Sequence, residues 1–183
     1  MSISRRDFLQ ATAAGSLGVG PLLAAATTEI PTRVLGKTGA RVSILAMGGG
    51  SRYLMYRDED QALEAARKAL DLGITYIDTS DDYGNNHLSE RRIGKVLKGR
   101  RSGIFLATKL SNRNGDDAER TVEASLKALD VDQVDLLHIH SLGSAEDLAR
   151  IESKGGVLEQ VMKLRDQKMT RFIGITSHTD PHV

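Results

Sequence analysis

The chain has 183 residues, of which 25 are Lys or Arg and 24 are Asp or Glu, so its formal net charge is +1. Because the charges balance, the composition gives no support for binding to nucleic acid or to an anionic membrane surface. The chain has no cysteine, which excludes disulfides, thiolate metal ligands and thiol nucleophiles within these residues.

The N-terminal segment has the layout of a bacterial export signal. Arg5 and Arg6 form an arginine pair, and a weakly apolar run rich in Ala and Gly follows and ends in three alanines at 24–26. This order predicts a twin-arginine signal in residues 1–26, a periplasmic or exported protein, and the twin-arginine export machinery as a partner. The run is too short and too rich in glycine for a stable membrane span, which takes about 20 apolar residues.

Residues 27–183 predict a small hairpin followed by alternating strands and helices. Segments 32–36 and 41–43 flank a turn, and residues 44–50 are typical of a buried strand that enters a glycine-rich loop. Further strands are expected at 74–78, 104–109, 134–140 and 171–175. Helices are expected at 58–72, 89–97, 116–129 and 145–167, the last with Gly155-Gly156 as a point where it can break.

Strict alternation of strands and helices indicates a parallel sheet with crossover helices. A closed (β/α)8 TIM barrel has eight strands and takes about 250 residues, whereas this pattern contains five strands. We therefore expect an incomplete barrel, the N-terminal part of a longer protein whose remaining strands follow Val183.

Four polar residues stand at or just past the carboxyl ends of predicted strands. Asp78 ends one strand and Tyr83 follows in its loop, while Lys109 and His140 each close a later strand. In alternating barrels these strand ends carry the chemistry. Carbonyl reduction needs a proton on oxygen, and a nearby ammonium makes a phenol a better proton donor. Tyr83 is thus a candidate acid, with Asp78 to hold Lys109 and His140 to orient the carbonyl.

These residues lie within motifs that resemble the aldo-keto reductase family. The matching segments are Ile77-Asp78-Thr79 with Tyr83-Gly84 and Ser89-Glu90, then Thr108-Lys109-Leu110, then 134–140, preceded by a hairpin at 33–39. The resemblance implies a (β/α)8 barrel that uses NADPH or NADH to reduce small-molecule aldehydes or ketones, with Tyr83 as general acid. It also implies cofactor contacts from Thr176 and Ser177, at the positions of the family's Ser-Asn pair that grips the nicotinamide carboxamide.

Alternatives remain open at this point. The barrel is also compatible with a nicotinamide-nucleotide-binding sensor or regulator with little turnover. His138, Asp78 and His140 could ligate a metal in a hydrolase, but the charge of Lys109 opposes a divalent cation, and we expect no metal site. A Schiff-base lyase through Lys109 leaves Tyr83 without a role. His138 is expected to be an interior histidine with satisfied hydrogen bonds, Asp81 and Asp82 to be solvated, and residues 27–183 alone to be inactive.

Overall fold

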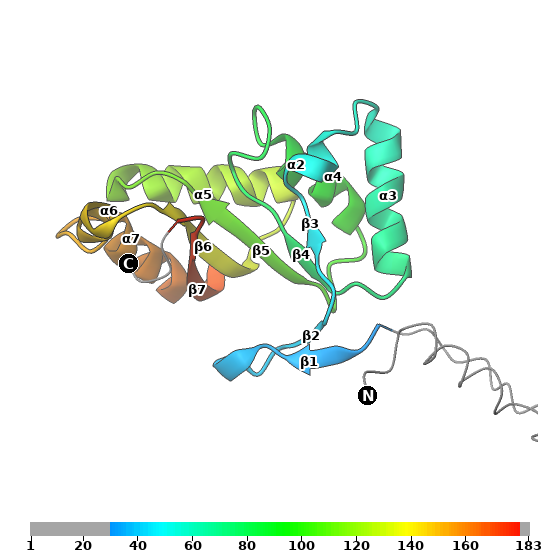
Figure 1. The fold of residues 1–183 in the computed structure, drawn as a ribbon, viewed down its shortest axis with the longest axis horizontal. Coiled ribbons are helices and arrows are strands. Elements are labelled where there is room, and N and C mark those ends of the chain that lie inside the picture. Colours follow the sequence, from blue (N-terminus) through cyan, green and yellow to red (C-terminus); the bar gives the residue numbers. More distant parts are fainter. Residues whose placement is uncertain (1–29, 180–183) are drawn as a thin grey trace, which may run out of the picture.

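The computed structural model of the chain describes residues 30–179, which form a parallel sheet with helices on one face and a hairpin across one end (Figure 1). The predicted export signal in residues 1–26 lies outside the described residues. In sheet order, the strands are β3 (Met47–Gly48), β4 (Tyr76–Asp78), β5 (Phe105–Leu110), β6 (Val134–Leu142) and β7 (Thr170–Ser177). All neighbours pair in parallel, so the five carboxyl ends share one edge of the sheet. This is the order and direction of strands expected of a partial α/β barrel.

The helices follow the strands in alternation, as the sequence predicts. They are α2 (Ser51–Leu54), α3 (Glu59–Asp71), α4 (Leu88–Leu97), α5 (Gly115–Leu129), α6 (Ala145–Ile151) and α7 (Val157–Asp166). The side chain of Asp58 caps α3 by accepting a hydrogen bond from the backbone N–H of Gln61. The side chain of Asn114 caps α5 in the same way, by accepting from the backbone N–H of Asp116. The predicted helix 145–167 does break, because Gly155 adopts φ +74° between α6 and α7.

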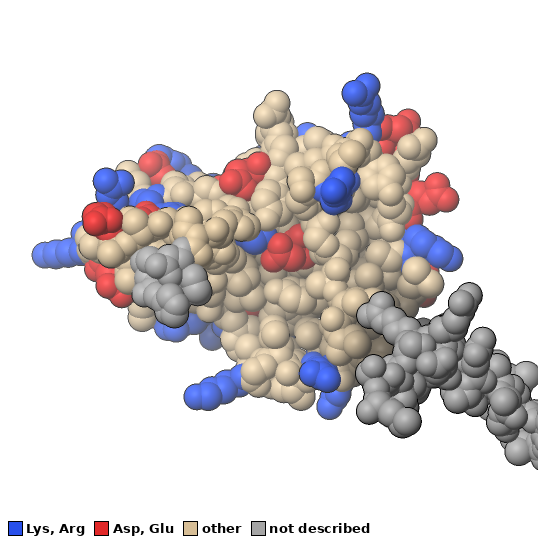
Figure 2. Space-filling model, in the orientation of Figure 1, with Lys and Arg blue, Asp and Glu red and all other residues tan. Residues whose placement is uncertain are grey.

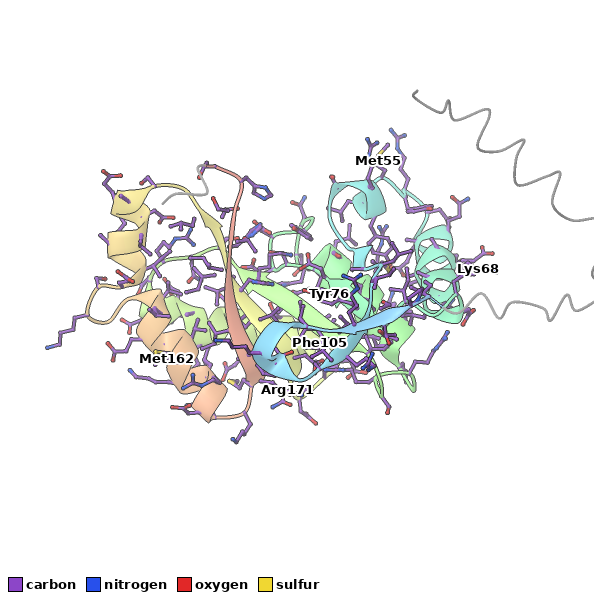
Figure 3. The ribbon with its side chains drawn as sticks, turned by 60° about the horizontal axis from the view of Figure 1, so that its bottom comes forward. Met55, Lys68, Tyr76, Phe105, Met162 and Arg171 are labelled. Atoms are coloured by element: carbon purple, nitrogen blue, oxygen red, sulfur yellow. The ribbon has the colours of Figure 1, made fainter. Side chains whose placement is uncertain are left out.

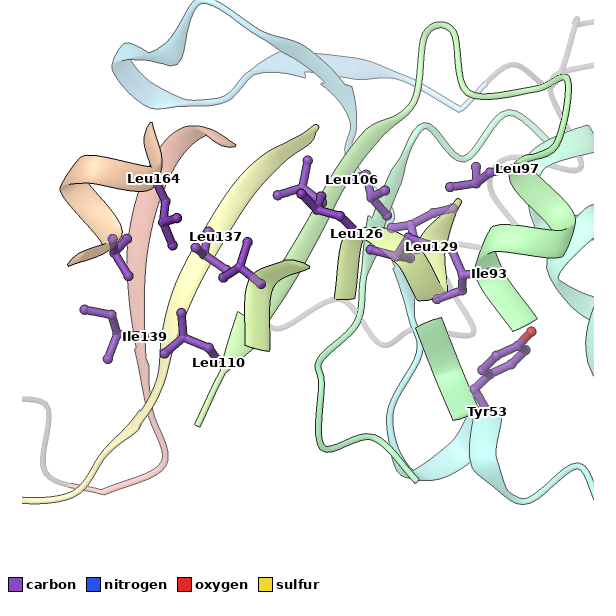
Figure 4. Close-up of a cluster of buried hydrophobic side chains, with 14 of the residues drawn as sticks. Tyr53, Ile93, Leu97, Leu106, Leu110, Leu126, Leu129, Leu137, Ile139 and Leu164 are labelled. Atoms are coloured by element: carbon purple, nitrogen blue, oxygen red, sulfur yellow. The ribbon is translucent and has the colours of Figure 1, made fainter. Parts of the chain in front are cut away.

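The central strands β5 and β6 are buried on both faces along most of their length, which is typical of parallel sheets. Leu106, Leu137 and Ile139 point to the helices and join the larger hydrophobic core (Figure 4). Gly94 of α4 packs so closely against α5 that a Cβ there would lie 2.7 Å from the carbonyl oxygens of Ala128 and Leu129. The intervening strand residues point to the other face of the sheet.

The hairpin covers the amino ends of the strands. It consists of β1 (Thr32–Val34), a 3₁₀ turn at Gly36–Thr38 and β2 (Arg41–Ser43). Val42 packs with Phe105 and Leu136 in a second core, and Tyr76 meets the Phe105 ring edge-on at 5.2 Å (Figure 3). The hairpin thus closes the end of the sheet opposite the predicted catalytic residues.

A buried carboxylate ties three strands together at this same end. Asp135 of β6 accepts hydrogen bonds from Arg171 of β7 at 2.6 Å and from Arg101 at 2.7 Å. It also accepts one from the backbone N–H of Leu106 in β5 at 2.9 Å. A buried carboxylate with this many donors is well compensated for its loss of water.

One strand prediction is wrong in part. Residues 44–50 are not a continuous buried strand, because Ile44 is 51% and Leu45 57% exposed, and only Met47–Gly48 pairs in the sheet. The first residues of this segment connect the hairpin to the sheet. The short helix α2 that follows is not predicted from the sequence. In residues 30–179, no helix has the length and apolar character to cross a membrane. Basic and acidic side chains are dispersed over the face shown in Figure 2.

Candidate active site

Three adjacent strands bring the four predicted residues to one edge of the sheet. Asp78 is the last residue of β4, Lys109 the penultimate residue of β5, and His140 lies near the end of β6. Tyr83 lies in the loop between β4 and α4. The convergence follows from the parallel order β4-β5-β6, since parallel neighbours end at the same edge.

Lys109 is the centre of the group. Its side chain is only 4% exposed, and its Nζ donates to Asp78 Oδ1 at 2.5 Å and to the carbonyl oxygen of Thr79 at 2.6 Å. The same Nζ lies 4.5 Å from the centroid of the Tyr83 ring. A buried ammonium needs such partners, and they fix its position beside the phenol.

The Tyr83 ring lies between several neighbours. The His140 ring meets it edge-on, with centroids 5.9 Å apart. On another side the loop after β3 comes so close that a Cβ at Gly50 would lie 3.3 Å from the ring. Tyr83 is partly exposed, so its phenol stands at the boundary between the interior and solvent.

His140 is only 7% exposed, and its ring is held by a residue of the neighbouring strand β7. Its Nδ1 lies 2.8 Å from Thr176 Oγ1, which also accepts a hydrogen bond from the backbone N–H of Ser141 at 3.0 Å. Burial lowers the pKa of His140; nearby Lys109 and His178 act in the same direction, against Asp82. The ring is therefore neutral at neutral pH and can donate one N–H.

The loop that carries Tyr83 is fixed by Ser89 and Glu90, whose contacts sequence reasoning did not foresee. Ser89 Oγ donates to the carbonyl oxygen of Gly49 at 2.8 Å, and the backbone N–H of Ser89 donates to the carbonyl oxygen of Tyr83 at 3.0 Å. Glu90 is fully buried and accepts from Thr108 Oγ1 at 2.6 Å, while His87 Nδ1 lies 2.6 Å from its other oxygen. The only signal for this network is the Ser89-Glu90 motif itself.

Of the two loop acids expected to be solvated, Asp82 is exposed as expected, whereas Asp81 is not. Asp81 is half-buried, and burial together with the charge of Asp82 raises its pKa. Asp82 is exposed and accepts from Ser111 Oγ at 2.8 Å; burial raises its pKa, but hydrogen bonds from Ser80 and Ser111 outweigh this and lower it. The charges of both acids act to raise the pKa of His140, against the larger effect of burial.

His138 is an interior residue, as expected, but its hydrogen bonds are not satisfied. It faces the barrel interior one layer below His140, beside a cavity of about 570 Å³. Its buried Nδ1 has no hydrogen-bond partner among residues 30–179, and a Cβ at Gly174 would lie 2.5 Å from that nitrogen. Burial lowers the pKa of His138, so it too is neutral. No group of three or more His, Asp or Glu residues with metal-binding geometry occurs in this part of the chain.

Thr176 and Ser177, the predicted cofactor contacts, lie at the end of β7 and already have partners within the chain. Thr176 Oγ1 contacts His140 and Ser141, as described above. Ser177 Oγ donates to the carbonyl oxygen of Leu142 at 2.8 Å and accepts from the N–H of Thr179 at 3.1 Å. Both hydroxyls are at the same edge of the sheet as Tyr83, Lys109 and His140.

Comparison with known proteins identifies the relationship. A model of the aldo/keto reductase family matches residues 45–181. The chain belongs to the aldo/keto reductase family. Its relatives include L-galactose dehydrogenase of Arabidopsis thaliana, 37% identical over 162 residues, or 81% of this chain and 49% of that protein.

Two further relatives support the assignment. The aldo-keto reductase yakc [NADP(+)] of Schizosaccharomyces pombe is 30% identical over 81% of this chain and 46% of its own length. The holo form of an aldo-keto reductase from Bacillus halodurans has a TM-score of 0.71 and 31% identity, covering 82% of this chain and 51% of that one. This aldo/keto reductase chain thus spans about half the length of the curated relatives it matches.

Proposed function

We propose that the full-length protein is an NAD(P)H-dependent reductase that converts small aldehydes or ketones to alcohols, and that it catalyses the reverse oxidation. The observation that carries the proposal is the contact of the Lys109 ammonium, 4.5 Å from the Tyr83 ring centroid and anchored on Asp78. This contact supports Tyr83 as the group that gives a proton to the carbonyl oxygen. The membership of the family and the NADP(+) in the name of the yeast relative support the choice of cofactor.

In this proposal a bound reduced nicotinamide supplies the hydride, and the chain's own residues manage the proton. Tyr83 donates its phenolic proton as negative charge develops on the carbonyl oxygen, and Lys109 stabilises the resulting phenolate. Asp78 keeps Lys109 in place. If Thr176 Oγ1 gives its own proton to His140 Nδ1, the ring proton resides on Nε2, which can donate to the same carbonyl oxygen.

The residues proposed to meet the nicotinamide fit only part of its carboxamide. Ser177 Oγ donates its single proton in the hydrogen bond to the carbonyl oxygen of Leu142. In the arrangement above, Thr176 Oγ1 donates its proton to His140 Nδ1. Neither hydroxyl then has a proton left, so they can accept from the carboxamide NH₂ but cannot donate to its oxygen. We therefore assign Thr176 and Ser177 to the amide nitrogen side only.

The proposal concerns the full-length protein. Residues 27–183 alone are expected to be inactive, because β3 and β7 each have only one neighbour in the described sheet and the interior cavity beside His138 is open. We also propose export through the twin-arginine pathway, supported by Arg5-Arg6 and the apolar run that follows them.

The test is Tyr83→Phe in the full-length protein, assayed with glyceraldehyde and NADPH and, in reverse, with L-galactose and NADP⁺ or NAD⁺. Turnover should fall by about 100-fold or more, because a general acid is lost, while NADPH affinity, followed by nicotinamide fluorescence, should change little. Tyr76→Phe is the matched control, since Tyr76 is on β4 under the hairpin. Near-normal turnover in Tyr83→Phe would refute the role of Tyr83. NADPH binding by the wild type without turnover would favour a sensing barrel instead.

A further inference from the structure

The strand that carries His140 contains a β-bulge at this residue. In the pairing of β6 with β7, Ile139 is opposite Ile175 and Leu142 is opposite Ser177. Two residues of β6, His140 and Ser141, therefore oppose the single residue Thr176 of β7. A bulge re-aims the side chain that it carries and interrupts the regular ladder. Ser141 also has φ +55°, a conformation that a non-glycine residue adopts only when its surroundings hold it there.

Two groups hold this bulge, one from each side. Thr176 contacts the His140 ring and the Ser141 N–H, as described above. From the other side, Arg113 Nη2, in the loop between β5 and α5, donates to the carbonyl oxygens of His140 at 2.7 Å and of Ser141 at 3.2 Å. The direction of the His140 side chain thus depends on contacts outside the sheet ladder.

The guanidinium of Arg113 is itself fixed. Nε and Nη2 donate to the two carboxylate oxygens of Asp147 in α6, each at 2.8 Å, and Nη1 donates to the carbonyl oxygen of Ser111 at 3.0 Å. Asp147 also accepts from the N–H of Gly143 at 3.1 Å. Such a bidentate pair needs the planar fork of arginine, which lysine does not have.

We propose that Arg113, held by Asp147, is a positioning residue that aims His140 at the reacting carbonyl. This inference rests on the proposed function, because it assumes that His140 orients the substrate. Arg113 acts through the backbone of the bulge and contacts neither the phenol of Tyr83 nor the ammonium of Lys109 in the described hydrogen bonds. Its removal should therefore impair turnover far more than the binding of the cofactor.

The kinetic test uses Arg113→Lys and Asp147→Asn in the full-length protein, with glyceraldehyde and NADPH. We expect kcat/KM for glyceraldehyde to fall by up to about 100-fold, the cost of a misplaced catalytic group, and the dissociation constant of NADPH to change much less. In a His140→Ala background, Arg113→Lys should cause no further loss, because the residue it acts through is gone. Arg120→Lys is the matched control, since Arg120 pairs with Asp117 on the exposed surface of α5.

A second readout does not depend on activity. The imidazole ¹⁵N resonances of His140 should shift in Arg113→Lys and in Asp147→Asn, because the contact with Thr176 changes, and should stay in place in Arg120→Lys. Unchanged resonances together with unchanged kcat/KM would overturn the inference, as would a full additive loss in the His140→Ala background. If His140→Ala retains full activity, the proposed role of His140 fails, and the spectrum alone decides whether Arg113 positions the ring.

Discussion

At the scale of single residues, Lys109 carries a charge where water hardly reaches. Its three contacts, with Asp78, Thr79 and the Tyr83 ring, compensate for the lost hydration and place the charge beside the phenol. Other charged pairs such as Lys95–Glu59 are exposed on both sides and contribute little by comparison. The Lys109–Asp78 pair is different, because Lys109 is buried and its charge is held beside the candidate proton donor Tyr83.

We expect Lys109→Met in the full-length protein to lower turnover by about 100-fold or more. The phenolate of Tyr83 would lose its neighbouring positive charge, so proton donation would become harder. The Asp78 side chain is already 30% exposed beside Lys109, so water can hydrate its carboxylate in the variant and the fold should survive. The measurement is kcat with glyceraldehyde and NADPH, with Lys95→Met as control; near-normal turnover would show that Lys109 does not assist Tyr83.

The meeting of Asp78, Lys109 and His140 could be predicted from the sequence, because consecutive parallel strands end at one edge. The partners of Arg113 and Glu90 could not. Arg113 meets Asp147 across 34 residues and Glu90 meets Thr108 across 18, and no spacing rule connects side chains through a tertiary contact. The half-burial of Asp81 likewise depends on how the loop folds back onto β5, which the loop sequence does not reveal.

At the scale of elements, β6 is the strand that differs from its predicted end and is interrupted by a bulge. The predicted strand 134–140 has the correct start at Val134, but β6 continues to Leu142, two residues beyond the expected end. The bulge at His140 and Ser141 produces this difference, since it lets the strand pair again after the interruption. The cores of β5 and β6 can be predicted from the sequence because both strands are mostly apolar and buried on both faces. The strand prediction for residues 44–50 is wrong in part because most of that segment connects the hairpin to the sheet.

Strand β6 also makes stability depend on pH. Burial lowers the pKa of both His138 and His140, so protons bind the unfolded chain more readily than the folded one. The free energy of unfolding should therefore be highest above the ordinary histidine pKa of about 6.5 and decrease as the pH falls below it, until the folded-state pKa values are passed. Denaturant unfolding between pH 8 and pH 5 measures this.

The histidine origin of this dependence can be separated by variants. His138→Leu should flatten part of the curve, because one of the two imidazoles whose pKa is lowered by burial is removed. Stability that stays constant from pH 7.5 to pH 5 in the wild type would contradict the expectation.

At the scale of the whole molecule, the described sheet has two outer strands, β3 and β7. The site is at the carboxyl edge of this sheet, and the hairpin covers the amino edge, so function and closure occupy opposite ends (Figure 1). The sequence predicts this polarity through its strand–helix alternation, because every crossover returns the chain to the same starting edge.

Export is also a property of the whole molecule. Arg5-Arg6→Lys-Lys should keep the full-length protein in the cytoplasm, because the paired arginines are the feature that the pathway recognises. Cell fractionation followed by immunoblotting measures the distribution, and Arg33→Lys in the hairpin serves as the control. Undiminished periplasmic accumulation of the double-lysine variant would count against the predicted signal.

The buried Asp135 has a consequence for how the sheet opens. Because its carboxylate is bonded to Arg171, Arg101 and the Leu106 amide at once, separating β7 from β6 at that end leaves a buried charge short of donors. The amino ends of β5, β6 and β7 should therefore exchange their amide hydrogens slowly and as one cooperative unit. The last residues of β7 are free of this constraint, so the amide of Ser177 should exchange faster than that of Phe172. Uniform exchange along β7 would contradict this. The breathing motions of the chain would thus be concentrated at the end where a ligand must enter.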